Sequence, residues 1–415
     1  MMGSHPMHDN KISENLPPEK LGEKLGEKTG LKEQILDALR GFEFSAEECS
    51  TWLAELKQTT LLPDQAAAAA CRAQWQDLCK PLYSLGRLEE LICRLAGASG
   101  QKNPEISPRA AYIFVADNGI VEEGVSQTGQ EVTAQVLRNI NERKCTVKLW
   151  SERYGLDLIP VDLGARYYRG EEEPGAAEVF VHKIMPEGTH SFLRQDAMSR
   201  EQALEALAVG RECARAAARA GVRLLVGGEM GIGNTSSSTA LIAALLGCPP
   251  EEICGRGSGL SDEAFRHKSK VLGQALATRK LGPEDPLEAL AAVGGLDIAA
   301  LCGLYLGAAE ARVPVLLDGL ISYAAALCAF YLVPASQAFL IPTHVAREKG
   351  AAAVAKALNL KAVLDLDIAL GEGSGAILLI PLLEAALQDL NELPRFAEGH
   401  VEAYEDFAAK NAQEQ

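Results

Sequence analysis

The sequence predicts an α/β protein in which helices cover both faces of a parallel sheet, joined to a smaller helical domain. Short apolar runs without polar alternation mark the strands, as in sheets buried on both sides. Amphipathic helical patterns separate these runs, which favours parallel pairing. Clusters of glycine and polar residues follow several of the strands, and such clusters meet at one edge of a parallel sheet.

The first 100 residues divide into two parts. Residues 1–30 are polar and repeat Leu-Gly-Glu-Lys, so we expect a leader or tail that is not part of the fold. Residues 31–100 show only helical periodicity, as at 65–78 and 85–95. We expect them to form the small helical domain, together with part of 385–415.

After Pro108, short apolar runs typical of strands alternate with helical patterns. Residues 101–384 are therefore expected to form the α/β catalytic domain. The predicted strands are 111–116, 156–161, 178–184, 223–226, 313–317, 338–341 and 362–366. The predicted helices are 132–150, 200–220, 236–246, 262–278, 296–311, 321–333, 345–358 and 376–390.

Net charge, cysteine content and hydropathy argue against several classes of function. A net charge of −16 and a pI near 5.0 disfavour a nucleic-acid partner. Ten cysteines without a C-x-x-C pair are expected to be free thiols of a cytoplasmic protein. Residues 319–343 carry no charged side chain but contain Pro334, which predicts a buried helix and strand rather than a membrane span.

The segment 227–235 (GGEMGIGNT) is the most informative in the chain. We interpret it as a strand-to-helix turn in which glycines let the backbone approach a ligand. The following helix would offer N–H groups to an anion, with Asn234 and Thr235 beside them. Gly231 and Gly233 fit a phosphate site, and Glu229 has no evident structural duty. The alternative is a turn that merely needs flexible residues.

Two further glycine-rich segments are candidate site loops. Gly255 and Gly257 flank Arg256 ahead of a helix that contains Lys268, which suits an anionic phosphoribosyl group, although a surface linker is the alternative. Glu372 lies between Gly371 and Gly373. It is either a helix-dipole partner or a general base with a pKa raised by burial.

Other motifs are missing or weak. The chain has no Walker loop, no G-x-S-x-G and no H-E-x-x-H, so we expect no metal. Gly231 and Gly233 lack the third glycine of a dinucleotide fingerprint, so an oxidoreductase that uses a nicotinamide cofactor is the weakest of three hypotheses. His344 and Glu348 are placed on one helix face, where capping or packing explains them.

The sequence resembles the nicotinate-nucleotide–dimethylbenzimidazole phosphoribosyltransferase family over about residues 71–384. The segments that carry the resemblance are SLGRLE at 84–89, ADNG at 116–119, VT at 132–133, VDLG at 161–164, GEMGIGNT at 228–235, DP at 285–286, GGLD at 294–297, PVLLDG at 314–319, PTH at 342–344 and LGEGSGA at 370–376.

The resemblance implies a homodimeric enzyme with a Rossmann-like domain, a small helical domain and no cofactor. Such enzymes transfer phosphoribose from nicotinate mononucleotide to an aromatic base, release nicotinate and form an α-ribotide with inversion. Glu372 then resembles the general base of the family. Glu229 resembles a residue that stabilises the positive charge developing at the anomeric carbon. Lys268 matches a lysine near the phosphoribosyl group. Asp318, Ser322, Gly371 and Gly373 complete the expected substrate-binding set.

Four departures from the family pattern are expected to border the base pocket. They are Tyr83, Asn118, Thr128 and Val136, where the family favours other residues. They raise the hypothesis of another acceptor, such as a different benzimidazole, a purine or a phenol. For a phenol, the active unit would be a heterodimer with a paralogous chain. A non-catalytic subunit of such a pair is the remaining alternative.

Overall fold

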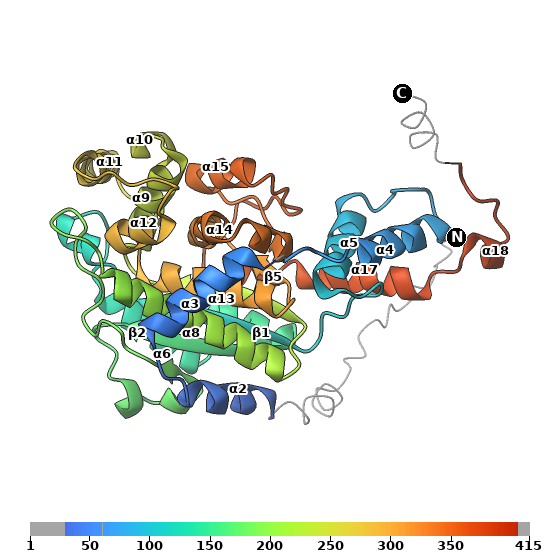
Figure 1. Cartoon of the computed structure of the whole chain (residues 1–415), viewed down its shortest axis with the longest axis horizontal. Coiled ribbons are helices and arrows are strands. Elements are labelled where there is room, and N and C mark those ends of the chain that lie inside the picture. The colour runs from blue at the N-terminus through green and yellow to red at the C-terminus, as the bar shows by residue number, and fades with distance from the viewer. Residues whose placement is uncertain (1–29, 60, 406–415) are drawn as a thin grey trace, which may run out of the picture.

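The computed structural model describes residues 30–59 and 61–405, and it contains one six-stranded, all-parallel sheet with the order β3-β2-β1-β4-β5-β6 (Figure 1). The strands are β1 (Arg109–Ala116), β2 (Leu156–Gly164), β3 (Phe180–Val181), β4 (Leu224–Met230), β5 (Val315–Leu317) and β6 (Leu340–Pro342). The predicted parallel α/β fold is therefore confirmed. The strand order changes direction at β1 and β4, where ligands of such sheets bind beyond the carboxyl ends.

Both faces of the sheet are covered by helices. Along β1, Tyr112 and Phe114 enter one apolar core, whereas Ile113 and Val115 enter the other, because successive side chains point to opposite faces. The first core is formed chiefly with α8 (Arg200–Arg219), α9 (Asn234–Leu246), α12 (Pro286–Val293), α13 (Leu296–Glu310) and α14 (Leu320–Leu332). The second is formed with α5 (Arg87–Ser99), α6 (Glu131–Asn141), α7 (Thr146–Arg153), α16 (Ser374–Ile377) and α17 (Ile380–Glu392).

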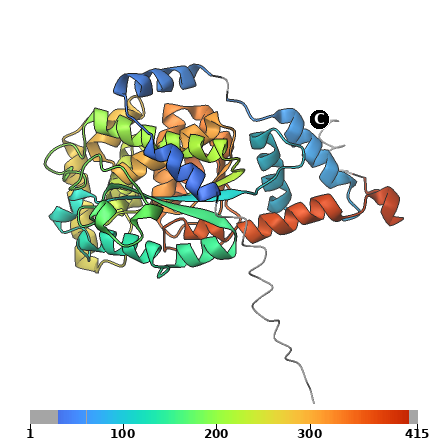
Figure 2. The ribbon, with the colours of Figure 1, turned by 90° about the horizontal axis from the view of Figure 1, so that it is seen from below.

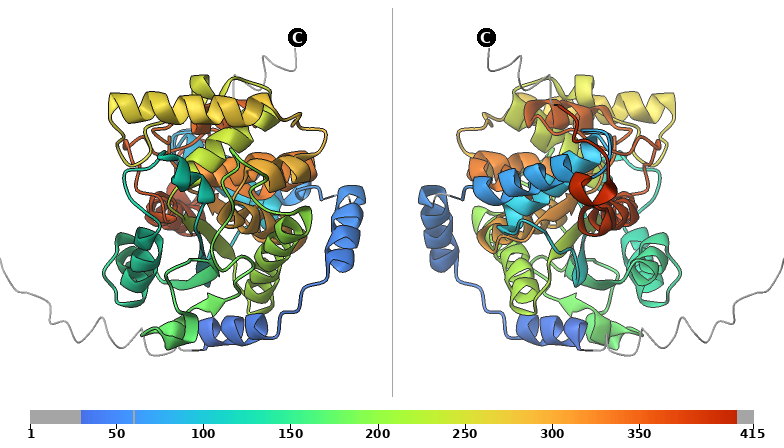
Figure 3. Two further views of the ribbon diagram at one scale, coloured as in Figure 1. Left: turned by 90° about the vertical axis from the view of Figure 1, so that its left-hand side faces the viewer. Right: turned by 90° about the vertical axis from the view of Figure 1, so that its right-hand side faces the viewer.

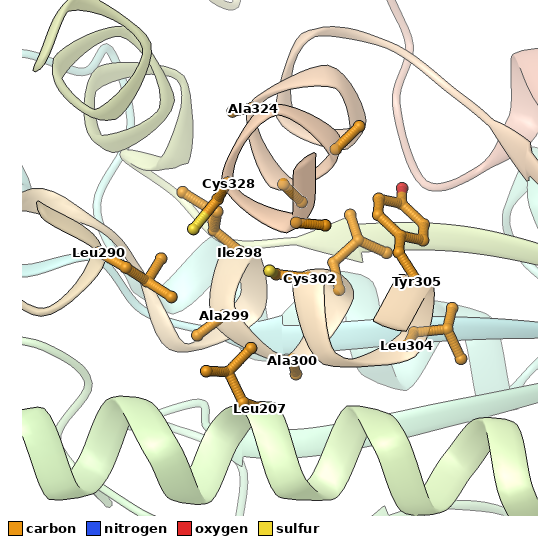
Figure 4. Close-up of a cluster of buried hydrophobic side chains, with 14 of the residues drawn as sticks. Leu207, Leu290, Ile298, Ala299, Ala300, Cys302, Leu304, Tyr305, Ala324 and Cys328 are labelled. Atoms are coloured by element: carbon orange, nitrogen blue, oxygen red, sulfur yellow. The ribbon is translucent and has the colours of Figure 1, made fainter. Parts of the chain in front are cut away.

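Helix α13 lies at the centre of the first core, between α8 and α14 (Figure 4). A Cβ at Gly210 of α8 would lie 1.8 Å from the carbonyl oxygen of Ala300, so only glycine allows this approach of the two helices. The uncharged segment 319–343 becomes α14, a 3₁₀ turn η4 (Pro334–Phe339) and the buried strand β6, as predicted. Within residues 30–59 and 61–405, no helix combines the length and apolarity that a membrane crossing requires.

Helices α4 (Gln65–Asp77), α5 and α17 extend the second core beyond the sheet and form a cluster beside the α/β body (Figures 1 and 2). In contrast, α2 (Leu31–Arg40) and α3 (Ala46–Gln58) run along the outside of the body and pack on α8 (Figure 3). Residues 31–58 thus contact the α/β core, although the sequence grouped them with the small helical domain. The exact domain boundaries stay a prediction, and residues 1–29 lie outside the described part of the chain.

Three elements differ from the sequence-based expectation. Strand β4 continues to Met230, so Glu229 lies on a strand and not in a turn, because pairing with β1 overrides the low strand preference of two glycines. The predicted helix 132–150 is divided at Arg143, whose φ is +58°. Residues 362–366 make only an isolated bridge between His344 and Leu364.

The C-terminal helices also differ in their starts. The predicted helix 345–358 begins only at α15 (Lys349–Ala357), so His344 and Glu348 precede it and do not share a helix face. The predicted helix 376–390 divides into α16 and α17, with Pro381 in the first turn of α17. The remaining helices are α10 (Pro250–Ile253), α11 (Asp262–Ala277) and α18 (Phe396–Gly399), with 3₁₀ turns η1 (Gly119–Glu123), η2 (Gly170–Glu172) and η3 (Ala176–Glu178).

Candidate active site

A cavity opens beyond the carboxyl end of β4, beside the start of α9. Its walls are Val125, Ser126, residues 229–235, residues 256–258, Leu260, Lys268, residues 319–321, His344, Glu348 and residues 368–372. The cavity lies at the edge of the sheet where the strand order predicts a ligand site.

Most of the predicted site residues line this cavity. Those on its walls are Glu229, Gly231, Gly233, Asn234, Thr235, Gly257, Lys268, Gly371 and Glu372. Gly255 lines an adjoining cavity that shares Arg256, Gly257 and Ser258 with the first. Asp318 and Ser322 are buried behind the wall, where the Ser322 hydroxyl accepts a hydrogen bond from the Asp318 N–H at 2.9 Å.

The four residues predicted to border the base pocket are not among the cavity walls within the described part of this chain. Tyr83 is exposed beside the α4–α5 helices, and Thr128 is exposed in the loop before α6. Val136 packs against the second core. Asn118 is fully buried, where its side-chain oxygen accepts a hydrogen bond from the Ser237 hydroxyl at 2.7 Å.

Glu229 is held at the end of β4 by a side-chain amide. Asn234 Nδ2 donates to Glu229 Oε2 and, at 3.0 Å, to Asp297 Oδ2. One amide nitrogen therefore bridges two buried carboxyls. Burial raises the pKa of Glu229 well above its usual range, and the nearby Asp297 and Asp318 raise it further.

Glu372 occupies a turn of unusual backbone geometry. Gly371, Glu372 and Gly373 have φ values of +82°, +61° and +77°, so the middle, non-glycine residue is in the left-handed region. Such a conformation costs on the order of 1–3 kcal/mol and persists only where the surroundings fix it. Asp318 supplies part of that restraint, because its oxygens accept from the N–H groups of Gly373 at 3.0 Å and Ala376 at 3.1 Å.

The electrostatics of Glu372 bear on the two roles that its sequence left open. Burial, and secondarily the Asp318 charge, raises the pKa of Glu372 to about 7. A helix-dipole partner would instead have a lowered pKa, because a helix N-terminus favours the ionised form. A carboxyl poised near neutrality suits a general base.

Lys268 reaches the cavity from α11. Its side chain is 1% exposed, and its Nζ donates to Thr235 Oγ1 at 2.9 Å. Burial lowers the pKa of Lys268. An ammonium group with one neutral acceptor and little water is prepared to bind an anion, which would favour its charged form.

A family model described as a phosphoribosyltransferase matches residues 61–401. Relatives named nicotinate-nucleotide–dimethylbenzimidazole phosphoribosyltransferase include one from Chloroflexus aggregans, 43% identical over 82% of this chain and 95% of its own length. Another, from Pseudomonas putida, is 44% identical over 81% of this chain and 95% of its length. The chain belongs to the nicotinate-nucleotide–dimethylbenzimidazole phosphoribosyltransferase family.

The fold of this phosphoribosyltransferase family member agrees with a solved relative. The crystal structure of CobT from Thermus thermophilus superposes with a TM-score of 0.75 at 38% identity, covering 82% of this chain and all of the other. The Rossmann-like fold inferred from the resemblance is therefore confirmed.

One buried residue of this phosphoribosyltransferase was missed as a site candidate. Asp297 follows Gly294 and Gly295 at the start of α13, and its side chain is fully buried. A carboxyl in the first turn of an otherwise apolar helix is the signal that could have identified it. The segment GGLD at 294–297 carries part of the family resemblance. Among residues 30–59 and 61–405, no group of three or more metal-binding side chains is found.

Proposed function

We propose that this protein transfers phosphoribose from nicotinate mononucleotide to 5,6-dimethylbenzimidazole, releasing nicotinate and forming an α-ribotide. The observation that carries the proposal is that Glu229, Glu372 and Lys268 face one cavity, although 143 residues separate the two glutamates along the chain. A Cβ at Gly371 would lie 3.1 Å from Glu229 Oε1, so the Glu372 turn passes directly over Glu229.

We assign the binding of the nicotinate mononucleotide phosphate to Lys268 and the groups around it. The ammonium group and the Thr235 hydroxyl are 2.9 Å apart and belong to the helices α11 and α9. Both groups can donate to a phosphate oxygen, and the positive end of α9 adds favourable electrostatics. The protein carries a net charge of −16, so this local cation is needed to bind an anion.

The proton transfer is assigned to Glu372. One ring nitrogen of the benzimidazole attacks the anomeric carbon with its lone pair, and the proton on the other nitrogen passes to the Glu372 carboxylate. The bond from the anomeric carbon to the pyridine nitrogen breaks, and its electron pair leaves with nicotinate. Attack on the face opposite the leaving group inverts the anomeric carbon and gives the α product.

Glu229 is assigned to the developing positive charge. As the bond to the pyridine nitrogen breaks, charge builds on the anomeric carbon and ring oxygen. A carboxylate fixed in a buried site lowers the energy of that charge more than it would in water. The pKa of Glu229 is raised by its neighbours and by burial, so a cationic substrate beside it would favour loss of its proton.

The acceptor is assigned to dimethylbenzimidazole rather than to a purine or a phenol. The hypothesis of another base depended on Tyr83, Asn118, Thr128 and Val136, and none of these is among the walls of the cavity described above. We further propose that the active unit is a homodimer. Light scattering of the purified chain, combined with turnover in the absence of any other protein, tests this against the paralogous heterodimer.

The deciding experiment incubates the purified chain with nicotinate mononucleotide and a panel of bases. Release of nicotinate is followed by chromatography, and the products are identified by mass and by the NMR coupling of the anomeric proton. We expect turnover with dimethylbenzimidazole and an α-linkage. No release with any base would favour the non-catalytic subunit, and faster turnover of phenols would overturn the assigned acceptor.

A further inference from the structure

Asp297 is linked to Glu229 through a single amide group. Asn234 Nδ2 donates to Oδ2 of Asp297 at 3.0 Å and also to Oε2 of Glu229. The other Asp297 oxygen accepts from Asn118 Nδ2 at 3.5 Å, and Ser237 fixes Asn118 in turn. The side chain of Asp297 is fully buried, and it is not among the residues that form the cavity wall.

Two glycines let the backbone approach the Asp297 carboxyl closely. A Cβ at Gly295 would lie 2.4 Å from Oδ1, and a Cβ at Gly231 would lie 2.8 Å from Oδ2. Neither glycine has a positive φ, so close approach and not backbone conformation explains these two glycines. The chain therefore packs tightly around this carboxylate on both sides.

We propose that Asp297 is a positioning residue for Glu229: it fixes the rotamer of Asn234, which in turn holds the Glu229 carboxylate toward the anomeric carbon. Asp297 also accepts from the backbone N–H of Ile298, the kind of partner that would satisfy a merely structural carboxylate at the first turn of α13. The bridge through Asn234 goes beyond such a role, because it couples Asp297 to Glu229 on the cavity wall. The inference depends on the proposed phosphoribosyl transfer.

The substitution Asp297→Asn tests this without changing the size of the side chain. Both Asp297 oxygens face side-chain N–H donors, from Asn118 and Asn234. An asparagine must turn its own NH₂ group toward one of these donors, so it cannot satisfy both. We expect kcat to fall about 10- to 100-fold, as for residues that orient a functional group, with a change of less than about threefold in KM for nicotinate mononucleotide.

The decisive measurement is a double-mutant cycle with Glu229→Gln. If Asp297 acts through Glu229, the double variant turns over within about threefold of Glu229→Gln alone. The matched control is Asp162→Asn, another fully buried carboxyl at a strand end, which accepts from the N–H groups of Gly164 and Ala165. We expect its effect to multiply with that of Glu229→Gln.

Failure of the positioning role and failure of the proposed reaction give different results. The positioning role would be overturned if the losses in kcat caused by Asp297→Asn and Glu229→Gln multiply in the double variant. It would also be overturned if Asp297→Asn alone keeps the full kcat. Neither outcome would contradict the proposed reaction. No turnover by the unmodified chain would overturn the reaction itself. Circular dichroism and thermal melts of each variant identify unfolding, and if Asp297→Asn does not fold, the cycle is run with Asn118→Ala, which removes the other side-chain support of Asp297.

Discussion

The two glutamates of the cavity are held in opposite ways. Glu229 lies on a regular strand, and its carboxyl accepts a hydrogen bond from Asn234. Glu372 lies on a left-handed turn that Asp318 restrains through backbone N–H groups only. Within the part of the chain that the structure describes, no hydrogen bond to the Glu372 carboxyl is found. A fixed carboxyl suits charge stabilisation, whereas a carboxyl without a partner is available for a proton.

The largest effect is expected from Glu372→Gln, which removes the proton acceptor while keeping the shape of the side chain. A positioned general base contributes about 10²–10⁴-fold, so kcat should fall by about that factor. Nicotinate mononucleotide affinity, measured by calorimetry, should change little because Lys268 and Thr235 are untouched. A variant that keeps more than a tenth of the wild-type kcat would assign the proton transfer to another group.

The next effect is expected from Glu229→Gln. Loss of one preorganised charge at a developing cation should lower kcat by about 10²-fold, with a smaller change in KM. Steady-state kinetics with nicotinate mononucleotide as the varied substrate measures both. If KM rises and kcat is unchanged, Glu229 binds the ground state and the proposed division of roles is wrong.

A smaller effect is expected in the pH dependence. The base must be ionised, and the pKa of Glu372 is about 7, so the rate should rise with pH until about 7 and then level off. Asp318→Asn removes a charge that raises this pKa, so the rising limb should move to lower pH. If the rising limb of the pH profile does not move in this variant, the group whose ionisation produces the limb is not Glu372.

The smallest effect concerns stability. The pKa of Glu372 rises from 4.5 in its ordinary state to about 7 in the folded chain, so the folded state binds this proton more tightly. Stability is therefore lost as pH increases from about 4.5 through 7. The carboxyl is partly exposed, so we expect Glu372→Gln to gain only about 1–2 kcal/mol between pH 4 and pH 8 relative to wild type. Denaturant unfolding at both pH values measures this, and an equal difference at both would contradict the raised pKa.

The sequence identified the candidate site residues that carry local signals. Glu229 and Glu372 lie among glycines, Lys268 follows a glycine-rich loop, and the resemblance supplied their expected roles. The structure brings all three to one cavity. The partners of these residues were not predictable in the same way. Asp297 reaches Glu229 only because α13 packs beneath β4, and the support of Glu372 by Asp318 spans 54 residues of chain. Tertiary contacts of this kind leave no periodic pattern in the sequence.

For β4, the sequence signal was local, but the secondary structure predicted from it was wrong. The residues Gly227 and Gly228 read as a turn from composition, but they pair with Tyr112 and Ile113 as a regular strand. A Cβ at Gly228 would lie 2.6 Å from the carbonyl carbon of Glu372, so glycine is required there by the close passage of another segment. The glycines predicted a close approach of two segments, which the structure shows, but the turn predicted at this position was wrong.

The α4–α5–α17 cluster has a consequence for the order of events during synthesis. Cys79 donates its N–H to the carbonyl oxygen of Pro394 at 2.9 Å, and Gln74 Nε2 donates to that of Leu390 at 3.0 Å. Two of the three helices leave the ribosome more than 280 residues before the third. The part of the α4–α5 surface that α17 covers therefore stays exposed to solvent until translation is nearly finished, and a chain truncated before α17 would keep that apolar surface exposed.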